Sequence, residues 1–498
     1  AAGPPPLGRP GAAAPGRAWH LLDAHEVVGL LRGGLVTPAE LIEVVERRVE
    51  ATNASVQATP ILCLDRAREA AAALKHPSQP PAGYLYGLPV LIKDTQAVAG
   101  VLFTEGSSLY STRIAEESDA VVRQIEARGG LVVGKTNVPE FAAGAQSFNE
   151  VFPTTVSPWD TRTTAGGSSG GAASALASCQ GWLATGSDLG GSLRTPAAFC
   201  GVVGLRPTPG RVPRDPDGPS KPFEALHAVS GPMGRCVRDV GLLLDAMAGS
   251  GGWDFVPPPL ADDFESFERS AVRGAQRVGG CAPPWRARWS SLGCSVQPAV
   301  EALCRAAAAE LLCSGETNDK KAKKALDEVS AGALDFAAAD RVFNVLRGES
   351  FAAEYKDLLA DPKTRDSVKP EIRWNAAVGS VPGAARMADL ARRDLSKYTA
   401  QVRVLFEDVD ILCAPATLDA AFDASVRYPT HQVGQDFSDY LGWMRPVCLV
   451  TVMLCPAIVL PCGFLEDGRP VGLQLVAPPG RDDLVLEAAA HLEARLAL

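Results

Sequence analysis

Apolar segments of strand length alternate with amphipathic segments of helical length over most of the chain. Residues 37–40, Thr-Pro-Ala-Glu, predict a helix start, because the threonine can cap the helix, proline suits its first position and the glutamate completes a capping box. Apolar residues then recur at helical spacing, at Leu41, Val44, Val45 and Val49. From about residue 84, apolar runs such as 89–92 and 131–133 are separated by helical patterns. This alternation predicts an α/β protein with a mainly parallel or mixed sheet and helices on both faces.

The same two patterns continue to the C-terminal end. Residues 327–410 are predicted to be largely helical, and 482–496 to form a closing amphipathic helix. The longest apolar run, 447–460, is interrupted by Pro456 and is too short to span a bilayer, so we predict a buried strand there. A further helix is predicted over 239–247, with a structural ion pair between Arg235 and Asp239 at its start.

Two glycine-rich turns presenting serine are the most informative feature of the sequence. They read GGSSGG at 166–171 and GGS at 190–192, and a helix of small residues and a short apolar strand are predicted between them. Glycine allows the backbone to approach a ligand closely, so clustered glycines indicate exposed N–H groups. A serine beside such groups suits a nucleophile that has an oxyanion hole next to it.

A serine nucleophile needs a base, and no histidine lies near these turns in the sequence. Lys93 follows the apolar run 89–92, which would deliver one cation to the end of a buried strand. A lysine can act as a base if burial keeps its amine neutral. Lys93 is therefore the candidate base.

These motifs together resemble the amidase signature family. Lys93 at a strand end, GGSSGG at 166–171 and GSDLGGSLRTPA at 186–197 carry the resemblance, which extends through GKTN at 134–137, SGPM at 230–233 and VGLQL at 471–475. It covers about residues 20–495. It implies one large domain, built on a mixed twisted β-sheet core that helices cover on both faces.

The family uses a Ser–cis-Ser–Lys triad, and its residues can be carried over position by position. By this resemblance Ser192 is the nucleophile, Ser168 the bridging serine after a cis peptide bond, and Lys93 the base. The implied oxyanion hole consists of the backbone N–H groups of Leu189, Gly190, Gly191 and Ser192. The implied supporting residues are Ser169, Asp188 and Arg194.

The implied activity is hydrolysis of a carboxylic amide to a carboxylate and ammonia or an amine, through an acyl-enzyme on Ser192. A relay through Ser168 and Lys93 suits this reaction, because the proton taken from the nucleophile must reach the leaving nitrogen. No metal and no organic cofactor are implied. The expected partner is a small-molecule amide. Sequence departures are mild: Ser187 stands where family members often have threonine, and Ala172 where serine is frequent.

The substrate pocket is less well defined by the sequence. We expect a signature core at about 84–248 and a helical, pocket-forming region at about 327–450. Phe141, by resemblance, and Trp374, one of the aromatic residues of that region, are the substrate-binding candidates. Aromatic residues at helical spacing more often belong to an ordinary core.

Composition narrows the classes of partner. The net charge is −9, which argues against a nucleic-acid partner because phosphate binding needs clustered Lys and Arg. No membrane span is predicted, and a homodimer is compatible with the sequence.

The twelve cysteines are scattered without metal-ligand spacing, which indicates a reduced, intracellular protein, cytoplasmic or organellar. Residues 1–19 are rich in Ala, Pro and Gly and are expected to form a flexible tail, which is also compatible with a targeting remnant. Residues 20–498 are expected to form the folded domain. Residues 314–325 are expected to be a charged, exposed excursion.

Two alternative functions remain open. One is that of the A-type component of a glutamine-dependent tRNA amidotransferase, which shares the triad but passes ammonia to a partner. The other is a catalytically silent scaffold or receptor, although such a protein would be expected to lose the nucleophile, and Lys93, Ser168 and Ser192 are all present.

Overall fold

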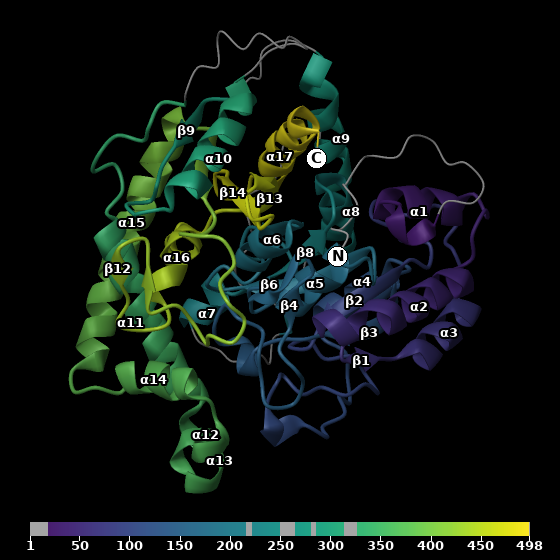
Figure 1. The fold of residues 1–498 in the computed structure, drawn as a ribbon, viewed down its shortest axis with the longest axis horizontal. Helices are drawn as coiled ribbons and strands as arrows, with labels where there is room; N and C mark the ends of the chain where they lie inside the picture. Colours follow the sequence, from purple (N-terminus) through teal and green to yellow (C-terminus); the bar gives the residue numbers. More distant parts are fainter. Residues whose placement is uncertain (1–17, 216–221, 250–263, 280–284, 313–325, 498) are drawn as a thin grey trace.

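The fold is organised around one ten-stranded mixed sheet (Figure 1), seen in a computed structural model that describes residues 18–215, 222–249, 264–279, 285–312 and 326–497. The strand order is β1-β3-β2-β6-β8-β7-β13-β14-β10-β9. β2 pairs in parallel with both β3 and β6, and β10 with β9, while the other neighbours are antiparallel. The predicted α/β class with a mixed sheet and helices on both faces is confirmed.

Strand and helix bounds follow the predicted alternation. The strands are β1 Ile61–Leu62, β2 Pro89–Lys93, β3 Leu131–Thr136, β4 Val156–Ser157, β5 Asp160–Thr164, β6 Leu183–Asp188, β7 Val203–Arg206, β8 Val229–Gly234, β9 Ala287–Trp289, β10 Ile411–Pro415, β11 His431–Gln432, β12 Gln435–Asp436, β13 Ala457–Phe464 and β14 Pro470–Val476. The helices are α1 Ala24–Arg32, α2 Pro38–Val56, α3 Leu64–Ala73, α4 Ala120–Ala127, α5 Gly170–Ala177, α6 Arg194–Cys200, α7 Pro222–His227, α8 Val237–Met247, α9 Phe267–Gln276, α10 Pro298–Ala309, α11 Phe336–Glu354, α12 Lys356–Ala360, α13 Pro362–Ser367, α14 Pro370–Val378, α15 Ala384–Asp408, α16 Arg445–Val452 and α17 Asp482–Leu496.

The start of α2 shows how local sequence sets an element boundary. Thr37 Oγ1 accepts a hydrogen bond from the Glu40 N–H, and the Glu40 carboxylate accepts one from the Thr37 N–H at 2.8 Å. The predicted capping box is therefore present. The apolar face of the helix, including Leu41 and Val45, is fully buried.

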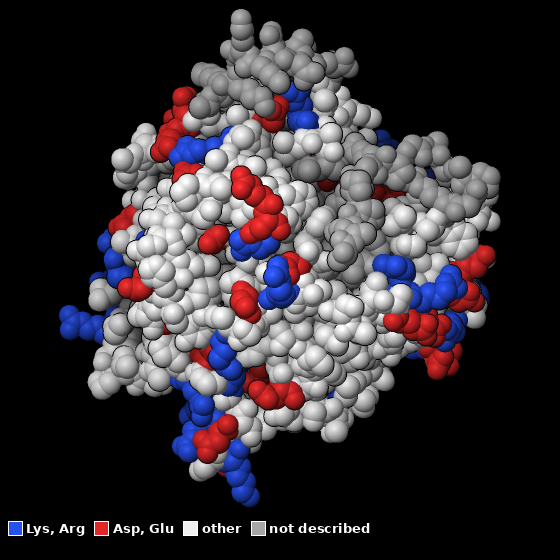
Figure 2. Space-filling view, viewed as in Figure 1, with Lys and Arg blue, Asp and Glu red and all other residues white. Residues whose placement is uncertain are grey.

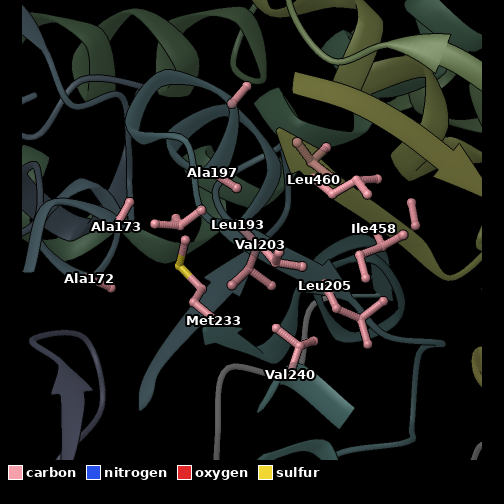
Figure 3. Packing of buried hydrophobic residues seen from close by; sticks show 14 of the residues in the cluster. Ala172, Ala173, Leu193, Ala197, Val203, Leu205, Met233, Val240, Ile458 and Leu460 are labelled. Carbon is pink, nitrogen blue, oxygen red and sulfur yellow. The ribbon is translucent and has the colours of Figure 1, made fainter. Parts of the chain in front are cut away.

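The core lies between the central strands and the helices on either side of them. Figure 3 shows Leu193 and Ala197, from α6 and the turn before it, on one side of β7 and β13, and Val240 of α8 on the other. Leu205 and Ile458 are register partners in the two strands between these layers. All these side chains are almost completely buried, so the glycine-rich turns that lead into α5 and α6 rest on a rigid core.

The predicted buried strand over 447–460 is half wrong. Residues 445–452 form α16, with Pro446 at its start, and strand structure begins at Ala457 with β13. Every residue from Pro446 to Val452 is buried. A segment buried on all sides carries no periodicity, so helix and strand cannot be told apart from the pattern alone.

The expected ion pair between Arg235 and Asp239 is also wrong. Asp239 is fully buried and accepts hydrogen bonds from His25 Nδ1 at 2.8 Å and from the N–H groups of Ala24 and His25. It therefore caps the N-terminus of α1, far away in sequence. Arg235 instead donates to the carbonyl oxygens of Gly181 and Leu22.

Several expectations fall partly or wholly outside the described residues. The predicted tail is described only from residue 18, and the charged excursion at 314–325 is not described. Within the described ranges, no helix is both long enough and apolar enough to cross a membrane. On the face in Figure 2, acidic and basic side chains lie interspersed in small groups instead of forming one basic patch.

Candidate active site

Two parallel strands and two helix starts bring the predicted site together. β2 ends at Lys93 and its parallel neighbour β6 ends at Asp188, so both residues emerge at the same edge of the sheet. Ser168 and Ser169 directly precede α5, and Ser192 lies in the turn before α6. The end of one strand pair and the starts of two helices therefore converge, although the residues are up to 99 positions apart in the sequence.

Lys93 is fully buried and surrounded by hydroxyl groups. Its Nζ lies 2.7 Å from Ser168 Oγ, 2.9 Å from Ser169 Oγ and 2.9 Å from Ser187 Oγ. Burial lowers the pKa of this amine to about 7, against a smaller opposing effect of Asp188. A substantial fraction of the amine is then neutral at neutral pH, as a base requires.

The bridging serine lies in a tightly packed turn. The peptide bond between Gly167 and Ser168 is cis, as the resemblance implied. A β-carbon at Gly167 would lie 2.7 Å from the backbone nitrogen of Gln146, so a side chain at this position would displace the neighbouring chain. Ser168 itself is 1% exposed.

A buried network of charges fixes the turn that carries Ser192. Arg194 makes two hydrogen bonds to the Asp188 carboxylate, at 3.0 and 2.8 Å, and Arg206 donates to the Asp188 carbonyl at 2.7 Å. Burial raises the pKa of the Asp188 carboxyl, but Arg194 and Arg206 outweigh it and hold that pKa at about 2. Arg194 also donates to Thr451 and Gln474, at 2.8 and 2.7 Å. Asp188 and Arg194 thus brace the turn.

The four amides of the expected oxyanion hole are not equivalent. The Gly191 N–H donates to Asp188 Oδ1 at 3.1 Å and so helps to hold the turn. In the part of the chain that the structure describes, the N–H groups of Leu189, Gly190 and Ser192 donate to no acceptor. Gly191 has φ +89°, and a β-carbon there would lie 2.2 Å from Val447 Cγ2, so only glycine fits.

Ser192 and Ser168 open into a small cavity of about 130 Å³, called the inner cavity. Its walls include Leu189 and Gly190 of the turn, Phe141 and Ala142, and Arg347, Phe351 and Tyr355 around α11. A larger cavity of about 500 Å³, called the outer cavity, shares with it Phe141, Ala142, Ser187, Ala228, Glu354 and Tyr355. The site is thus a small pocket with an adjoining wider space.

The two aromatic candidates have different positions. Phe141 lines both cavities, and its ring centroid lies 5.3 Å from that of Tyr355. Trp374 is half-buried, packs against Tyr440 at 5.8 Å between ring centroids, and lines neither cavity. Its substrate-binding role remains a prediction.

Three residues of the site are not predicted from the sequence. Ser187 stands out there only as a departure from the family pattern, yet its hydroxyl contacts Lys93 and lines both cavities. Arg347 and Glu354 of α11 carry no sequence signal of their own, because a charged residue in an otherwise helical pattern usually lies on the solvated face. The strongest available signal is their position in the expected pocket-forming region.

A possible metal-ligand set is found elsewhere in the described residues. Asp23, His25 and Cys236 bring one ligand atom each within 4.8 Å of one another. None of the three lines either cavity. This grouping is therefore separate from the walls of the site.

Comparison with known proteins agrees with this geometry. The Amidase family model matches residues 40–486. The chain is 34% identical to an acylamidase of Rhodococcus erythropolis, over 95% of both proteins. It is 31% identical to the A-type component of the glutamyl-tRNA(Gln) amidotransferase of Moorella thermoacetica, over 95% of this chain and 96% of that protein. The chain therefore belongs to the amidase signature family.

Solved structures give the same result for the fold. A structure of 6-aminohexanoate cyclic dimer hydrolase is 27% identical and covers 96% of this chain and 97% of its own, with a TM-score of 0.80. A bacterial aryl acylamidase of the amidase signature family has the same fold at 24% identity, with a TM-score of 0.80 over 95% of this chain and 96% of its own.

Proposed function

We propose that this protein hydrolyses a carboxylic amide through an acyl-enzyme on Ser192, with Ser168 and Lys93 as the proton relay. The observation that carries the proposal is the buried Lys93 amine, 2.7 Å from Ser168 Oγ, with Ser168 and Ser192 lining one cavity. The family membership supports hydrolysis of a C–N bond, and the site supplies the groups that this reaction needs.

In the first half-reaction, neutral Lys93 accepts the proton of Ser168 Oγ while Ser168 Oγ accepts that of Ser192. Ser192 Oγ then forms a bond to the amide carbonyl carbon. The negative charge that develops on the carbonyl oxygen is stabilised by backbone N–H groups, for which Leu189, Gly190 and Ser192 are available. The proton returns through Ser168 to the leaving nitrogen, the C–N bond breaks, and an amine leaves.

In the second half-reaction, water replaces the amine in the same relay. The relay removes one proton from the water as its oxygen attacks the ester carbonyl carbon, and it returns that proton to Ser192 Oγ as the ester bond breaks. The products are a carboxylate and the free enzyme. In both half-reactions, each proton that is transferred moves between a group of the protein and a reactant or between two groups of the protein.

Labelling with a fluorophosphonate tests this proposal without knowledge of the substrate. The purified protein should be labelled, and mass spectrometry should place the label on Ser192. The variants Ser192→Ala and Lys93→Ala should lose labelling or react far more slowly, while Ser396→Ala, an exposed serine of α15, should label normally. A well-folded protein that is not labelled, or is labelled elsewhere, would contradict the proposal.

A second candidate function is that of an amidotransferase A-type component, because the Moorella thermoacetica relative is similar over nearly the whole chain. Such a component would hydrolyse glutamine and pass ammonia to a partner. The two functions are separated by measuring ammonia release from glutamine and from simple amides by the purified chain. Turnover of simple amides but not of glutamine would exclude the second candidate. The silent-scaffold alternative would be supported only by absence of labelling at Ser192.

A further inference from the structure

Three side chains with different metal-binding atoms meet where two helices begin. The carboxylate of Asp23, the imidazole of His25 and the thiol of Cys236 bring one ligand atom each within 4.8 Å of one another. Asp23 and Cys236 directly precede α1 and α8, two helices that lie side by side (Figure 1). All three residues are half-buried, so the group is open to an ion from the solvent.

A second carboxylate holds the imidazole of His25 from behind. Nδ1 of His25 lies 2.8 Å from Oδ1 of Asp239, which is fully buried and lies 214 positions away in the sequence. Both oxygens of Asp239 are in use, because they also accept from the backbone N–H groups of Ala24 and His25. The other ring nitrogen, Nε2, has no hydrogen-bond partner among the described residues. A ligating histidine commonly has this arrangement, in which a carboxylate binds one ring nitrogen and the other faces the metal.

The thiol of Cys236 lies where a negative charge is favoured. Cys236 is the N-cap residue of α8, and the partial positive charge at a helix N-terminus stabilises a thiolate. The two arginines nearby have other partners: Arg235 donates to two backbone carbonyl oxygens, and Arg238 pairs with Glu268 at 2.8 Å. Within the described ranges, neither arginine forms a salt bridge with Asp23. The anionic ligands are therefore not already paired with a guanidinium.

The kinds of ligand atom select the metal. Ca²⁺ and Mg²⁺ are bound through oxygen, so a thiol and an imidazole do not suit them. Zn²⁺ is bound by sulfur, nitrogen and carboxylate oxygen at about 2.0–2.3 Å, usually in tetrahedral geometry, which places the ligand atoms roughly 3–4 Å apart. Three atoms within 4.8 Å of one another need only small side-chain movements to share one such ion.

We propose that Asp23, His25 and Cys236 bind one Zn²⁺ ion, with water as the fourth ligand, and that this ion joins the start of α1 to the start of α8. As the sulfur–zinc bond forms, the S–H bond of Cys236 breaks and its proton passes to the solvent. An ion that binds the folded chain and not the unfolded one stabilises the fold.

The proposed zinc site is independent of the proposed amide hydrolysis. None of its three ligands lines the inner or the outer cavity. The helix α8 packs against β6, β7 and β8, so the ion would fasten the segment around α1 to the layer that supports these strands. Failure of the zinc site would leave the relay at Ser192 untouched, and the reverse also holds.

Cobalt gives a spectroscopic test, because Co²⁺ can replace Zn²⁺ and its bond to a thiolate absorbs in the near ultraviolet. The full chain, free of affinity tags and stripped with EDTA, should bind one equivalent of Co²⁺ with this charge-transfer band, and Zn²⁺ should abolish the band. Cys236→Ser should lose the band, and His25→Gln should bind Co²⁺ at least ~10-fold more weakly. Cys294→Ser, which removes a half-buried cysteine outside the group, should behave like the wild type.

Alkylation tests the site in the wild-type protein and so covers a variant that does not fold. Peptide mass spectrometry after iodoacetamide treatment should show that one equivalent of Zn²⁺ slows modification of Cys236 but not of Cys294. Zn²⁺ should also raise the melting temperature of the wild type and leave that of folded Cys236→Ser unchanged. The inference is overturned if Zn²⁺ does not protect Cys236, if Co²⁺ gives no thiolate band, or if folded Cys236→Ser keeps that band.

Discussion

At the scale of single residues, three lysines, of which Lys93 and Lys135 are buried and Lys369 is half-buried, illustrate how surroundings decide chemistry. Lys135 Nζ lies 2.5 Å from Asp94 Oδ1, and Lys369 donates to the Ala143 carbonyl oxygen close to Glu140 and Glu371. Lys93 meets only hydroxyl groups, and burial lowers the pKa of its amine to about 7, below the value of about 8 for Lys369. A carboxylate partner would keep Lys93 charged and unable to act as a base.

The first prediction concerns the pH dependence of activity. Since the amine of Lys93 must be neutral, kcat/KM for any amide substrate should rise with pH through about 7, the pKa of that amine, and level off above it. At pH 6 it should be about tenfold below the plateau, as expected for one group titrating near 7. Rates of fluorophosphonate labelling of Ser192 should follow the same curve. A rate that is constant between pH 6 and 9 would contradict the role of Lys93.

A second prediction at this scale concerns stability. The pKa of Lys93 is about 7 in the folded protein and near its ordinary value of 10.5 in the unfolded chain, so the unfolded chain binds more protons between these values. The free-energy cost of burying Lys93 is largest below pH 7. It disappears as the pH rises to 10.5, the pKa of the amine in the unfolded chain. The melting temperature of the wild type relative to Lys93→Met should therefore increase from pH 7 to pH 9.5. A difference that does not change with pH would show that Lys93 is not buried as a neutral amine.

At the scale of elements, the site depends on how two helices begin. The N-cap residues of α5 and α6, Ser169 and Leu193, make no side-chain capping hydrogen bond, and the serines of these turns contribute to the site instead. The turn before α6 also packs against α16, the helix for which the sequence pattern predicts a strand, where Val447 lies against Gly191. The catalytic turn is thus shaped partly by an element near the other end of the chain.

Replacing Gly191 with alanine tests this contact. The backbone has positive φ, and the new β-carbon would lie 2.2 Å from Val447 Cγ2, so Gly191→Ala should destabilise the protein by more than ~2 kcal/mol and abolish labelling of Ser192. Gly34→Ala is the matched control, because Gly34 has φ +66° and no atom within 4 Å of the added β-carbon. It should cost only ~1 kcal/mol of backbone strain and leave labelling unchanged. Equal melting temperatures for the two variants would contradict the packing argument.

At the scale of the whole molecule, Arg194 joins segments that are far apart in the sequence. It contacts Asp188 of β6, Thr451 of α16 and Gln474 of β14, and it is completely buried. In the sheet, β8, β7 and β13 separate β6 from β14. The arginine therefore connects the N-terminal and C-terminal parts of the sheet at the site.

The expectation of a homodimer also belongs to the scale of the whole molecule. It stays a prediction, which sedimentation of the purified chain would test.

Loss of Arg194 should affect stability and activity together. Arg194→Met leaves the Asp188 carboxylate buried with only Arg206 as a cationic partner, and removal of one partner of a buried pair costs ~3–5 kcal/mol. The free energy of unfolding from urea titration should fall by that amount, and labelling of Ser192 should slow. Arg392→Met, which removes a surface pair with Glu349, should cost at most ~1 kcal/mol. Similar losses for the two variants would show that Arg194 does not brace the turn.

The sequence determined the elements and the chemical groups of the site. Capping residues and hydrophobic periodicity predicted α2 and α17, and the glycine-rich turns and Lys93 predicted the groups that gather at the strand ends. These features are local, because a cap, a helical period or a glycine turn is encoded within a few residues.

Only the tertiary structure decided how distant segments meet. Burial lowers the pKa of Lys93, Asp239 caps α1 instead of pairing with Arg235, and an arginine of α11 lines the inner cavity with Ser192. Residues 446–452 are helical although their pattern allows a strand, and the pattern could not distinguish the two because every one of these residues is buried. In each case the outcome depends on what lies opposite a residue in space, which the sequence around that residue does not encode.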